Sequence, residues 1–150
     1  PAGGIVLALF GDYRIMSGGK FKTGLNEVQV GLVVSPLIKN ALVRLIGPHP
    51  AAKILVTGSM LSPEQALEIG LVDELEADPE SVVKRSIAYC EQLLALPRNA
   101  MLATRELVRE DLRSLFDHDN SLEGTAFVQL WFSDSTQKTL NELVARLQKK

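Results

Sequence analysis

Two short segments of the sequence combine residue types that can do acid–base chemistry beside a carbonyl group. Gly3 and Gly4 form a pair near the start of the chain, and Glu27 lies in an apolar stretch bounded by Gly24 and Gly31. A carboxylate among apolar neighbours is partly desolvated and suits a general base. Backbone N–H groups at Gly3 can hold a carbonyl oxygen as it gains negative charge. On local pattern alone, a plain turn and a solvated loop carboxylate are the commoner origin of such residues.

The elements that position these residues are marked by helix caps. The Ser–Pro pairs at 35–36 and 62–63 each supply an N-cap and a first helical residue, and they predict helices at 37–46 and 64–69. A further helix is expected at 51–56, before a glycine that ends it.

Apolar runs between these caps predict short strands at 13–17 and 71–75. The run 5–10 is apolar throughout, so its periodicity does not decide between helix and strand. If a helix begins at Gly3, its free N–H groups point outward as a site for an anion or a carbonyl oxygen. Short helices alternating with short strands predict an α/β layer.

From Pro79 onward the pattern is helical, with apolar stripes separated by Pro97 and by a polar break at 117–120. The change of pattern predicts two regions, an α/β part at 1–77 and an α-helical part at 78–150. The apolar stripes exceed what one short helix layer can bury on itself, which indicates assembly with further copies of the chain.

Single residues in the helical part add three expectations. Phe127 and Trp131, four residues apart, are expected to be core or subunit-interface anchors. Met101, Val108, Leu112 and Leu115 form one stripe of a single expected helix. Cys90 has no cysteine to pair with and is expected to be a free, buried thiol.

Composition excludes several classes of function. The chain has 150 residues, 46% of them hydrophobic, and a formal net charge of −2, which favours one globular unit and argues against nucleic acid as a partner. The sequence contains no Cys/His cluster with metal-ligand spacing and no apolar stretch of about 20 residues, so neither a metal site nor a membrane span is expected. Because the chain starts at Pro1 rather than at Met, we expect upstream sequence to be missing.

Three segments in this order, 1–15, 24–31 and 61–73, resemble the crotonase (enoyl-CoA hydratase/isomerase) superfamily. The ending, 127–150, is similar to the terminal helices of the 3,2-enoyl-CoA isomerase branch. The resemblance implies an α/β fold, the carboxy-terminal part of a crotonase-like ββα spiral, followed by an α-helical trimerisation region. It also implies an acyl-CoA thioester as substrate, with no separate cofactor.

Residue by residue, the resemblance places Gly3, with Gly4 beside it, in the oxyanion hole and makes Glu27 the catalytic acid–base residue. Hydratases carry a second glutamate where this chain has Val6, and dienoyl-CoA isomerases carry an aspartate where it has Ser35. The resemblance therefore implies an isomerase that converts 3-enoyl-CoA to 2-trans-enoyl-CoA in the β-oxidation of unsaturated fatty acids. Glu27 alone would carry the proton from C2 to C4.

Further expectations follow from the same resemblance. Ile5, Val6 and Val33 are expected to line the acyl pocket, and the protein to form a homotrimer or hexamer. Its compartment would be the bacterial cytoplasm or the mitochondrial matrix, according to the host. Because the second oxyanion donor of the family lies upstream, the 150 residues alone are expected to have little activity. The alternatives are an enoyl-CoA hydratase, a thioester hydrolase, and a catalytically silent crotonase-like scaffold or RNA-binding protein.

Overall fold

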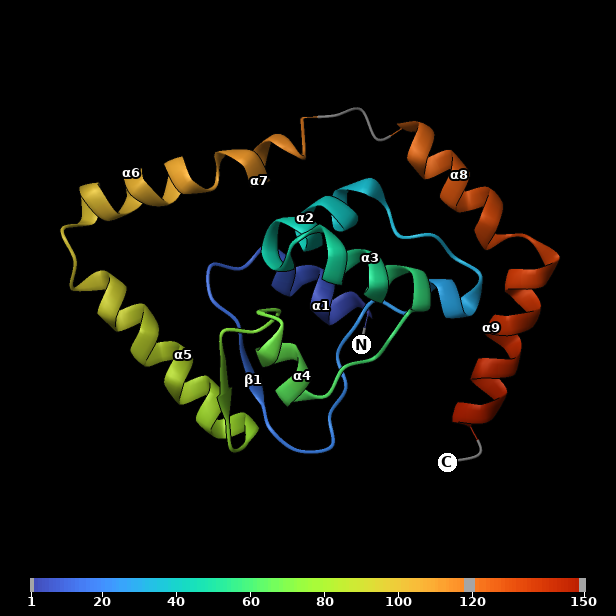
Figure 1. Ribbon diagram of the computed structural model, residues 1–150, viewed down its shortest axis with the longest axis horizontal. Helices are drawn as coiled ribbons and strands as arrows, with labels where there is room; N and C mark the ends of the chain where they lie inside the picture. Colours follow the sequence, from blue (N-terminus) through green and yellow to red (C-terminus); the bar gives the residue numbers. More distant parts are fainter. Residues whose placement is uncertain (1, 118–120, 149–150) are drawn as a thin grey trace.

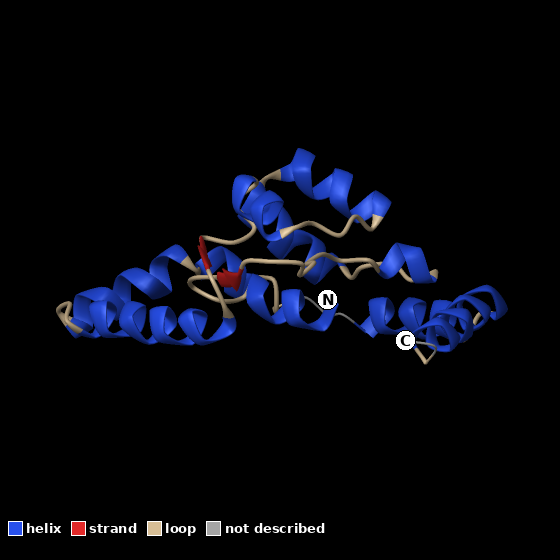
Figure 2. Cartoon of the chain, turned by 90° about the horizontal axis from the view of Figure 1, so that it is seen from below, coloured by secondary structure: helices blue, strands red, loops and turns tan. Residues whose placement is uncertain are grey.

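The computed structural model describes residues 2–117 and 121–148, most of them in helices, together with one small parallel sheet (Figure 1). Figure 2 shows the two strands to one side of the centre of the molecule, with helices on both sides of them. The elements in chain order are α1 (Ala2–Leu9), β1 (Ile15–Ser17), the 3-10 helix η1 (Glu27–Val30), α2 (Pro36–Ile46), α3 (Pro48–Thr57), α4 (Pro63–Glu68), β2 (Glu74–Glu76), α5 (Pro79–Leu94), α6 (Arg98–Val108), α7 (Glu110–Ser114), α8 (Ser121–Trp131) and α9 (Asp134–Leu147).

The hydrophobic core lies between α1, α2, α3 and α4. The undecided run 5–10 falls largely within α1, which contacts α2, and α2 packs in turn against α3. One long-range member of the core, Leu112, reaches it from α7. The buried residues of this cluster are Ile5, Leu9, Leu25, Ala41, Leu42, Ala51, Ala66, Leu71, Val72 and Leu112.

The predicted helix starts are confirmed for α2 and α4. Ser35 caps α2 by accepting a hydrogen bond from the Ile38 N–H at 3.4 Å. Ser62 and Gln65 form a reciprocal capping box at α4. The third helix starts earlier than predicted, at Pro48, because a proline in the first turn needs no acceptor for a backbone N–H.

The sheet consists of β1 and β2 paired in parallel, with Ile15 opposite Glu74. Both strands are shorter than predicted, and β2 starts three residues later. The reason lies in Asp73, whose carboxylate accepts a hydrogen bond from the Arg14 backbone N–H at 2.8 Å and pairs with the Arg14 guanidinium at 2.9 Å. This contact fixes 71–73 as a bend with Leu71 buried, so that ladder pairing begins only at Glu74.

The helical pattern predicted from Pro79 onward is confirmed by α5–α9, and these helices border the core on two sides. In Figure 1, α5, α6 and α7 lie along one side of α1–α4, and α8 and α9 lie on the other. Helix α5 contacts both strands. Two side-chain contacts hold it there: Tyr89 stacks on Tyr13, just before β1, with ring centroids 4.2 Å apart, and Arg85 pairs with Glu74 of β2. Cys90, one position further around this helix, is exposed in the chain, so the buried thiol expected for it is wrong.

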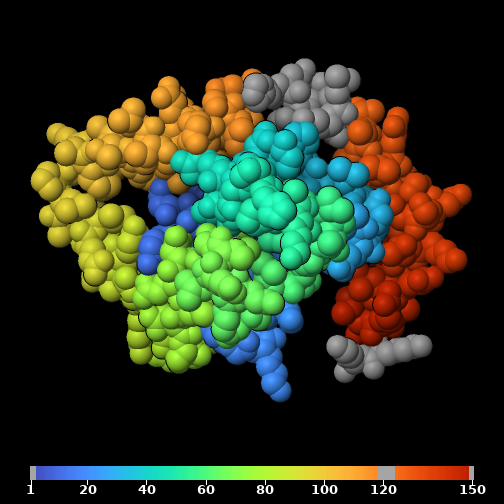
Figure 3. All heavy atoms as spheres, viewed as in Figure 1, coloured from blue at the N-terminus to red at the C-terminus, as the bar shows by residue number. Residues whose placement is uncertain are grey.

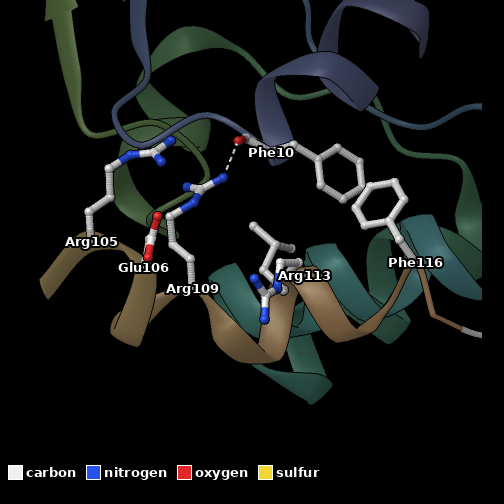
Figure 4. A pocket seen from close by; sticks show the side chains of 7 residues that line it. Phe10, Arg105, Glu106, Arg109, Arg113 and Phe116 are labelled. Carbon is white, nitrogen blue, oxygen red and sulfur yellow. Dashed lines mark hydrogen bonds between the residues drawn. The ribbon is translucent and has the colours of Figure 1, made fainter. Parts of the chain in front are cut away.

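The single helix expected beyond Pro97 is also wrong, because the chain breaks at Arg109 into α6 and α7. The break aims the Arg109 guanidinium at the carboxyl end of α1. There it donates to the Phe10 carbonyl at 2.6 Å and to the Asp12 carboxylate at 2.7 Å, as Figure 4 shows for Phe10. Arg105 pairs with the same Asp12 carboxylate at 2.8 Å. A charged donor at the free carbonyls of a helix end is stabilising, and here it fastens α6 and α7 to the core.

A second polar contact supports the same junction from α2. Arg44 donates to the Asp111 carboxylate at 2.6 Å and to the Val108 carbonyl at 2.6 Å. The hydrogen bond from Arg44 holds the pKa of the Asp111 carboxyl below its usual value. Together with the burial of Leu112, these contacts dock α7 onto the core.

We expect Arg109→Met to lower the free energy of unfolding by about 1–3 kcal/mol, the range for losing a hydrogen bond to a charged donor. The matched control is Arg113→Met, because Arg113 lies one turn further along and makes no side-chain hydrogen bond or ion pair within the described residues. Urea denaturation followed by circular dichroism measures both variants. Equal losses in the two variants would show that Arg109 does not fasten the helices.

Candidate active site

Glu27 is the first residue of η1, a single 3-10 turn between α1 and α2. Gly31 ends this turn in the left-handed region, with φ of 80°, and its N–H donates to the carbonyl oxygens of Glu27 and Val28. The Leu32 N–H donates to the Glu27 carbonyl as well, at 3.0 Å. The Glu27 carbonyl thus accepts two backbone hydrogen bonds, which close the turn on the carboxyl side of Glu27.

The carboxylate of Glu27 is in an unusual state. Its Oε2 atom is buried and has no hydrogen-bond partner, a property that it shares only with Arg14 Nε among the described side chains that are not exposed. An acceptor buried without a partner costs about 1–3 kcal/mol, more when the group is charged. An acceptor to which no protein group donates keeps its lone pairs available for a proton. Glu27 as a whole is half-buried, so it lies between the desolvated base and the solvated loop carboxylate considered above.

The segment before Glu27 is held against the loop that follows α3. Thr23 and Leu61 form an antiparallel bridge, with N···O distances of 3.0 and 2.8 Å. Next in the chain, Gly24 lies so close to this loop that a Cβ atom there would be 2.6 Å from the Ser59 carbonyl oxygen. Only glycine fits at this position without a shift of the backbone.

The middle of η1 is held by the end of α3. The Gln29 amide donates to the Gly58 carbonyl at 2.8 Å. Gly58 in turn leaves room for η1, because a Cβ atom there would come within 2.9 Å of both Gln29 Cγ and Val28 Cγ1.

The end of η1 is held by the last helix of the chain. Thr136 in α9 donates from Oγ1 to the Gly31 carbonyl at 3.0 Å, and a Cβ atom on Gly31 would lie 2.6 Å from that oxygen. Among the described glycines, Gly24, Gly31 and Gly58 are the ones where an added Cβ would come closer than 3.0 Å to another atom. All three surround the Glu27 segment.

Gly3 and Gly4 lie in the first turn of α1 and are exposed. The first four N–H groups of an α-helix have no acceptor within the helix, so the amides of these residues are available to an oxygen of a ligand. In Figure 1 the amino end of α1, marked N, is the end nearer to η1. The sequence did not decide whether a helix begins near Gly3, and in the structure α1 begins at Ala2.

The residues expected to line an acyl pocket are divided between different places. Ile5 is buried in the core and, with Gly4, lines a hollow of about 440 Å³ beside α1. Val6 is half-buried next to it. Val33 is 65% exposed and lines a second hollow of about 220 Å³ with Val28, and Glu27 lines neither of the two.

Sequence reasoning missed the residues that hold η1, namely Gln29, Gly58 and Thr136. A glycine that ends a helix, as Gly58 does, gives no sign that it also leaves room for a distant side chain. The signal for Thr136 is only that it stands in the first turn of a helix capped by Ser133. Its partner Gly31 lies 105 residues away, so no local pattern links them.

Two further features are absent from the described parts of the chain. Within residues 2–117 and 121–148, no group of three or more His, Cys, Asp or Glu side chains is placed to hold a metal ion. Over the same residues, none of the helices combines the length and apolar character that crossing a bilayer requires.

Comparison with known proteins gives consistent results over the whole chain. A family model described as enoyl-CoA hydratase/isomerase matches residues 1–150. Human mitochondrial enoyl-CoA delta isomerase 1 is 32% identical over 148 residues, which are 98% of this chain and 49% of the human protein. A probable enoyl-CoA hydratase of Mycobacterium avium is 35% identical over 102 residues, covering 68% of this chain and 39% of that protein.

The fold comparison agrees with the sequence comparison. The crystal structure of human mitochondrial delta3-delta2-enoyl-CoA isomerase superposes with a TM-score of 0.88 at 31% identity, over 99% of this chain and 58% of that one. The chain thus spans about half the length of the curated relatives that it matches over most of its own length.

We expect Gly31→Ala to destabilise the protein more than Gly70→Ala does. The two glycines have nearly the same φ, 80° and 76°, so both variants carry the left-handed strain of about 1–2 kcal/mol. An added Cβ at Gly70 meets nothing within 4 Å, whereas at Gly31 it collides with Thr136, which adds about 1–3 kcal/mol. The difference between the two unfolding midpoints in urea measures the collision, and equal midpoints would contradict the close contact of η1 with α9.

Proposed function

This chain belongs to the enoyl-CoA hydratase/isomerase family, and from that premise we propose that it shifts the double bond of a 3-enoyl-CoA to give 2-trans-enoyl-CoA. Its elements follow the crotonase fold that the sequence predicted. We assign the proton transfer to Glu27 and the binding of the thioester oxygen to the amides of Gly3 and Gly4. The reaction belongs to the breakdown of unsaturated fatty acids, and CoA enters as part of the substrate.

The observation that carries this proposal is the unpartnered Oε2 atom of Glu27. A proton-transferring base needs a lone pair that no protein donor occupies, on a carboxylate whose backbone does not move. The local hydrogen bonds of η1 and its contacts with α3 and α9 supply the second condition. The relatives named as isomerases support the choice of reaction.

The absence of a second acid on α1 favours isomerisation over hydration. Adding water to a double bond needs one group to activate the water and another to handle the second proton. Helix α1 has the sequence AGGIVLAL, with Val6 where hydratases carry a glutamate. Moving a double bond needs only one carboxylate, because the proton removed from the substrate is returned to it.

The proposed steps conserve the proton throughout. The Glu27 carboxylate removes a proton from C2 of the 3-enoyl thioester, and the electron pair of the broken C2–H bond moves toward the thioester oxygen. The resulting dienolate oxygen is held by the free N–H groups at the start of α1. Protonated Glu27 then delivers the proton to C4, and the double bond settles between C2 and C3. Losing one such oxygen donor costs about 10²–10³ in rate.

We propose that the helices from Pro79 onward join copies of this chain into a trimer, or a hexamer of two trimers. Phe127 and Trp131 stack with ring centroids 6.0 Å apart, and both are exposed, so of the two roles expected for them the core role is wrong and the interface role stands as the proposal. Figure 3 shows α8 and α9 as an outer rim of the molecule. Exposed apolar patches of this kind mark association surfaces.

Three further assignments complete the proposal. Residues 1–77 form the catalytic part and 78–150 the assembly part. Ile5, Val6 and Val33 contribute to the acyl pocket together with residues beyond this chain, so the 150 residues alone have little activity. The compartment follows the host, as the mitochondrial matrix in a eukaryote or the cytoplasm in a bacterium.

We expect the protein at its natural full length to convert 3-enoyl-CoA, and Glu27→Gln to lower the rate by about 10²–10⁴, the usual contribution of a positioned base. The control is Glu68→Gln, since Glu68 is an exposed carboxylate whose side chain makes no hydrogen bond or ion pair among the described residues, and this variant should retain the full rate. The absorbance of the conjugated 2-enoyl thioester follows the reaction. An untouched 3-enoyl-CoA, or an active Glu27→Gln, would give precedence to hydration, thioester hydrolysis or a silent scaffold.

We expect sedimentation of the full-length protein to give a trimer or hexamer, and Phe132→Asp to shift it to smaller species. Phe132 is 71% exposed in the single chain, so the charge harms assembly rather than folding. Phe21→Asp, at an apolar side chain of the α/β part that is 54% exposed, is the control and should leave the assembly intact. A monomeric wild type would refute the assembly proposal.

A further inference from the structure

The contact between α9 and η1 is made by a buried polar side chain. Thr136 is 1% exposed, and it is the one buried polar residue within the described parts of the chain. Its hydroxyl donates to the Gly31 carbonyl at 3.0 Å, and its backbone N–H is taken up by the Ser133 side chain that caps α9. Burying a hydroxyl is unfavourable unless it is hydrogen-bonded, so this contact has a specific geometry rather than a merely apolar one.

Two hydrogen bonds in series connect Thr136 to Glu27. The Thr136 hydroxyl fixes the carbonyl of Gly31, and the N–H of Gly31 donates to the carbonyl of Glu27. Because η1 has only four residues, a rotation at its end turns the residue at its start. Gly31 has no Cβ, and the space that a Cβ would take is filled by Thr136.

We infer that Thr136 is a positioning residue for Glu27, acting through Gly31 rather than through contact with the substrate. This inference rests on the proposed function of Glu27. The hold from α3, through Gln29 and Gly58, fixes the middle of η1 and leaves its end to α9. Without the hydroxyl of Thr136, the end of the turn is free to rotate, and the carboxylate leaves the direction in which it meets C2 of the substrate. Catalytic groups have to be held within about 0.5 Å of their productive position.

The test replaces Thr136 by Val, which keeps the shape and removes the hydroxyl, in the protein at its natural full length. We expect kcat to fall by about 10- to 100-fold, the scale of a misplacement of about 1 Å, with KM changed by less than about twofold. Thr136→Ser keeps the donor and should restore most of the rate. Thr139→Val is the matched control, because the Thr139 hydroxyl in the same helix bonds only to the Ser135 carbonyl of that helix.

Amide hydrogen exchange provides a readout that does not depend on turnover. In Thr136→Val, exchange should rise at 27–32, and it should stay unchanged there in Thr139→Val. An unchanged kcat in Thr136→Val overturns the inference, and so does a loss of rate accompanied by faster exchange throughout the chain.

The two proposals can fail separately. If the wild type does not convert 3-enoyl-CoA, the proposed function fails. The exchange at 27–32 then still decides whether Thr136 holds η1, and unchanged exchange in Thr136→Val would refute that hold.

Discussion

The close approach of backbone to backbone around η1 is the constraint on which the rest of the site depends. Gly24, Gly58 and Gly31 let the loop after α3, the end of α3 and the start of α9 come nearer to the Glu27 segment than any side chain would allow. A 3-10 turn of four residues has too few internal hydrogen bonds to be rigid by itself. Neighbouring segments, which contact the turn at both ends and in the middle, keep it rigid.

Within this rigid frame, the Glu27 carboxylate is the group that the fold leaves unsatisfied. Nearby polar groups are paired: Gln29 with Gly58, Thr23 with Leu61, and Thr136 with Gly31. An unpaired buried oxygen reduces stability, so its survival in a well-paired environment is typical of a site kept for chemistry.

The sequence predicts what is local and misses what is distant. Ser35 and Ser62 mark helix starts because a cap acts within three residues of itself, and both starts are confirmed. The strand limits were wrong because the Arg14–Asp73 contact, across 59 residues, decides where pairing begins. The break at Arg109 could not be predicted either, because it accompanies the hydrogen bond from Arg109 to the end of α1, which is far away in the sequence.

The candidate site divides in the same way. The types and spacing of Gly3, Gly4 and Glu27 were sufficient to single them out, and the family resemblance drawn from their segments is confirmed. The sequence could not show that Glu27 is the first residue of a 3-10 turn, or that its Oε2 atom is buried without a hydrogen-bond partner. The burial of this atom depends on contacts with α3 and α9, which are distant in the sequence.

The bond between Thr136 and Gly31 joins residues 105 positions apart, and this separation has a consequence for the growing chain. A ribosome makes proteins from the amino end, so η1 leaves it long before α9 exists. During that interval the turn that carries Glu27 has its hold on α3 and lacks its hold on α9. In this proposal the last described helix completes the hold on η1, and a nascent chain stopped before it would carry Glu27 in a turn still free at one end.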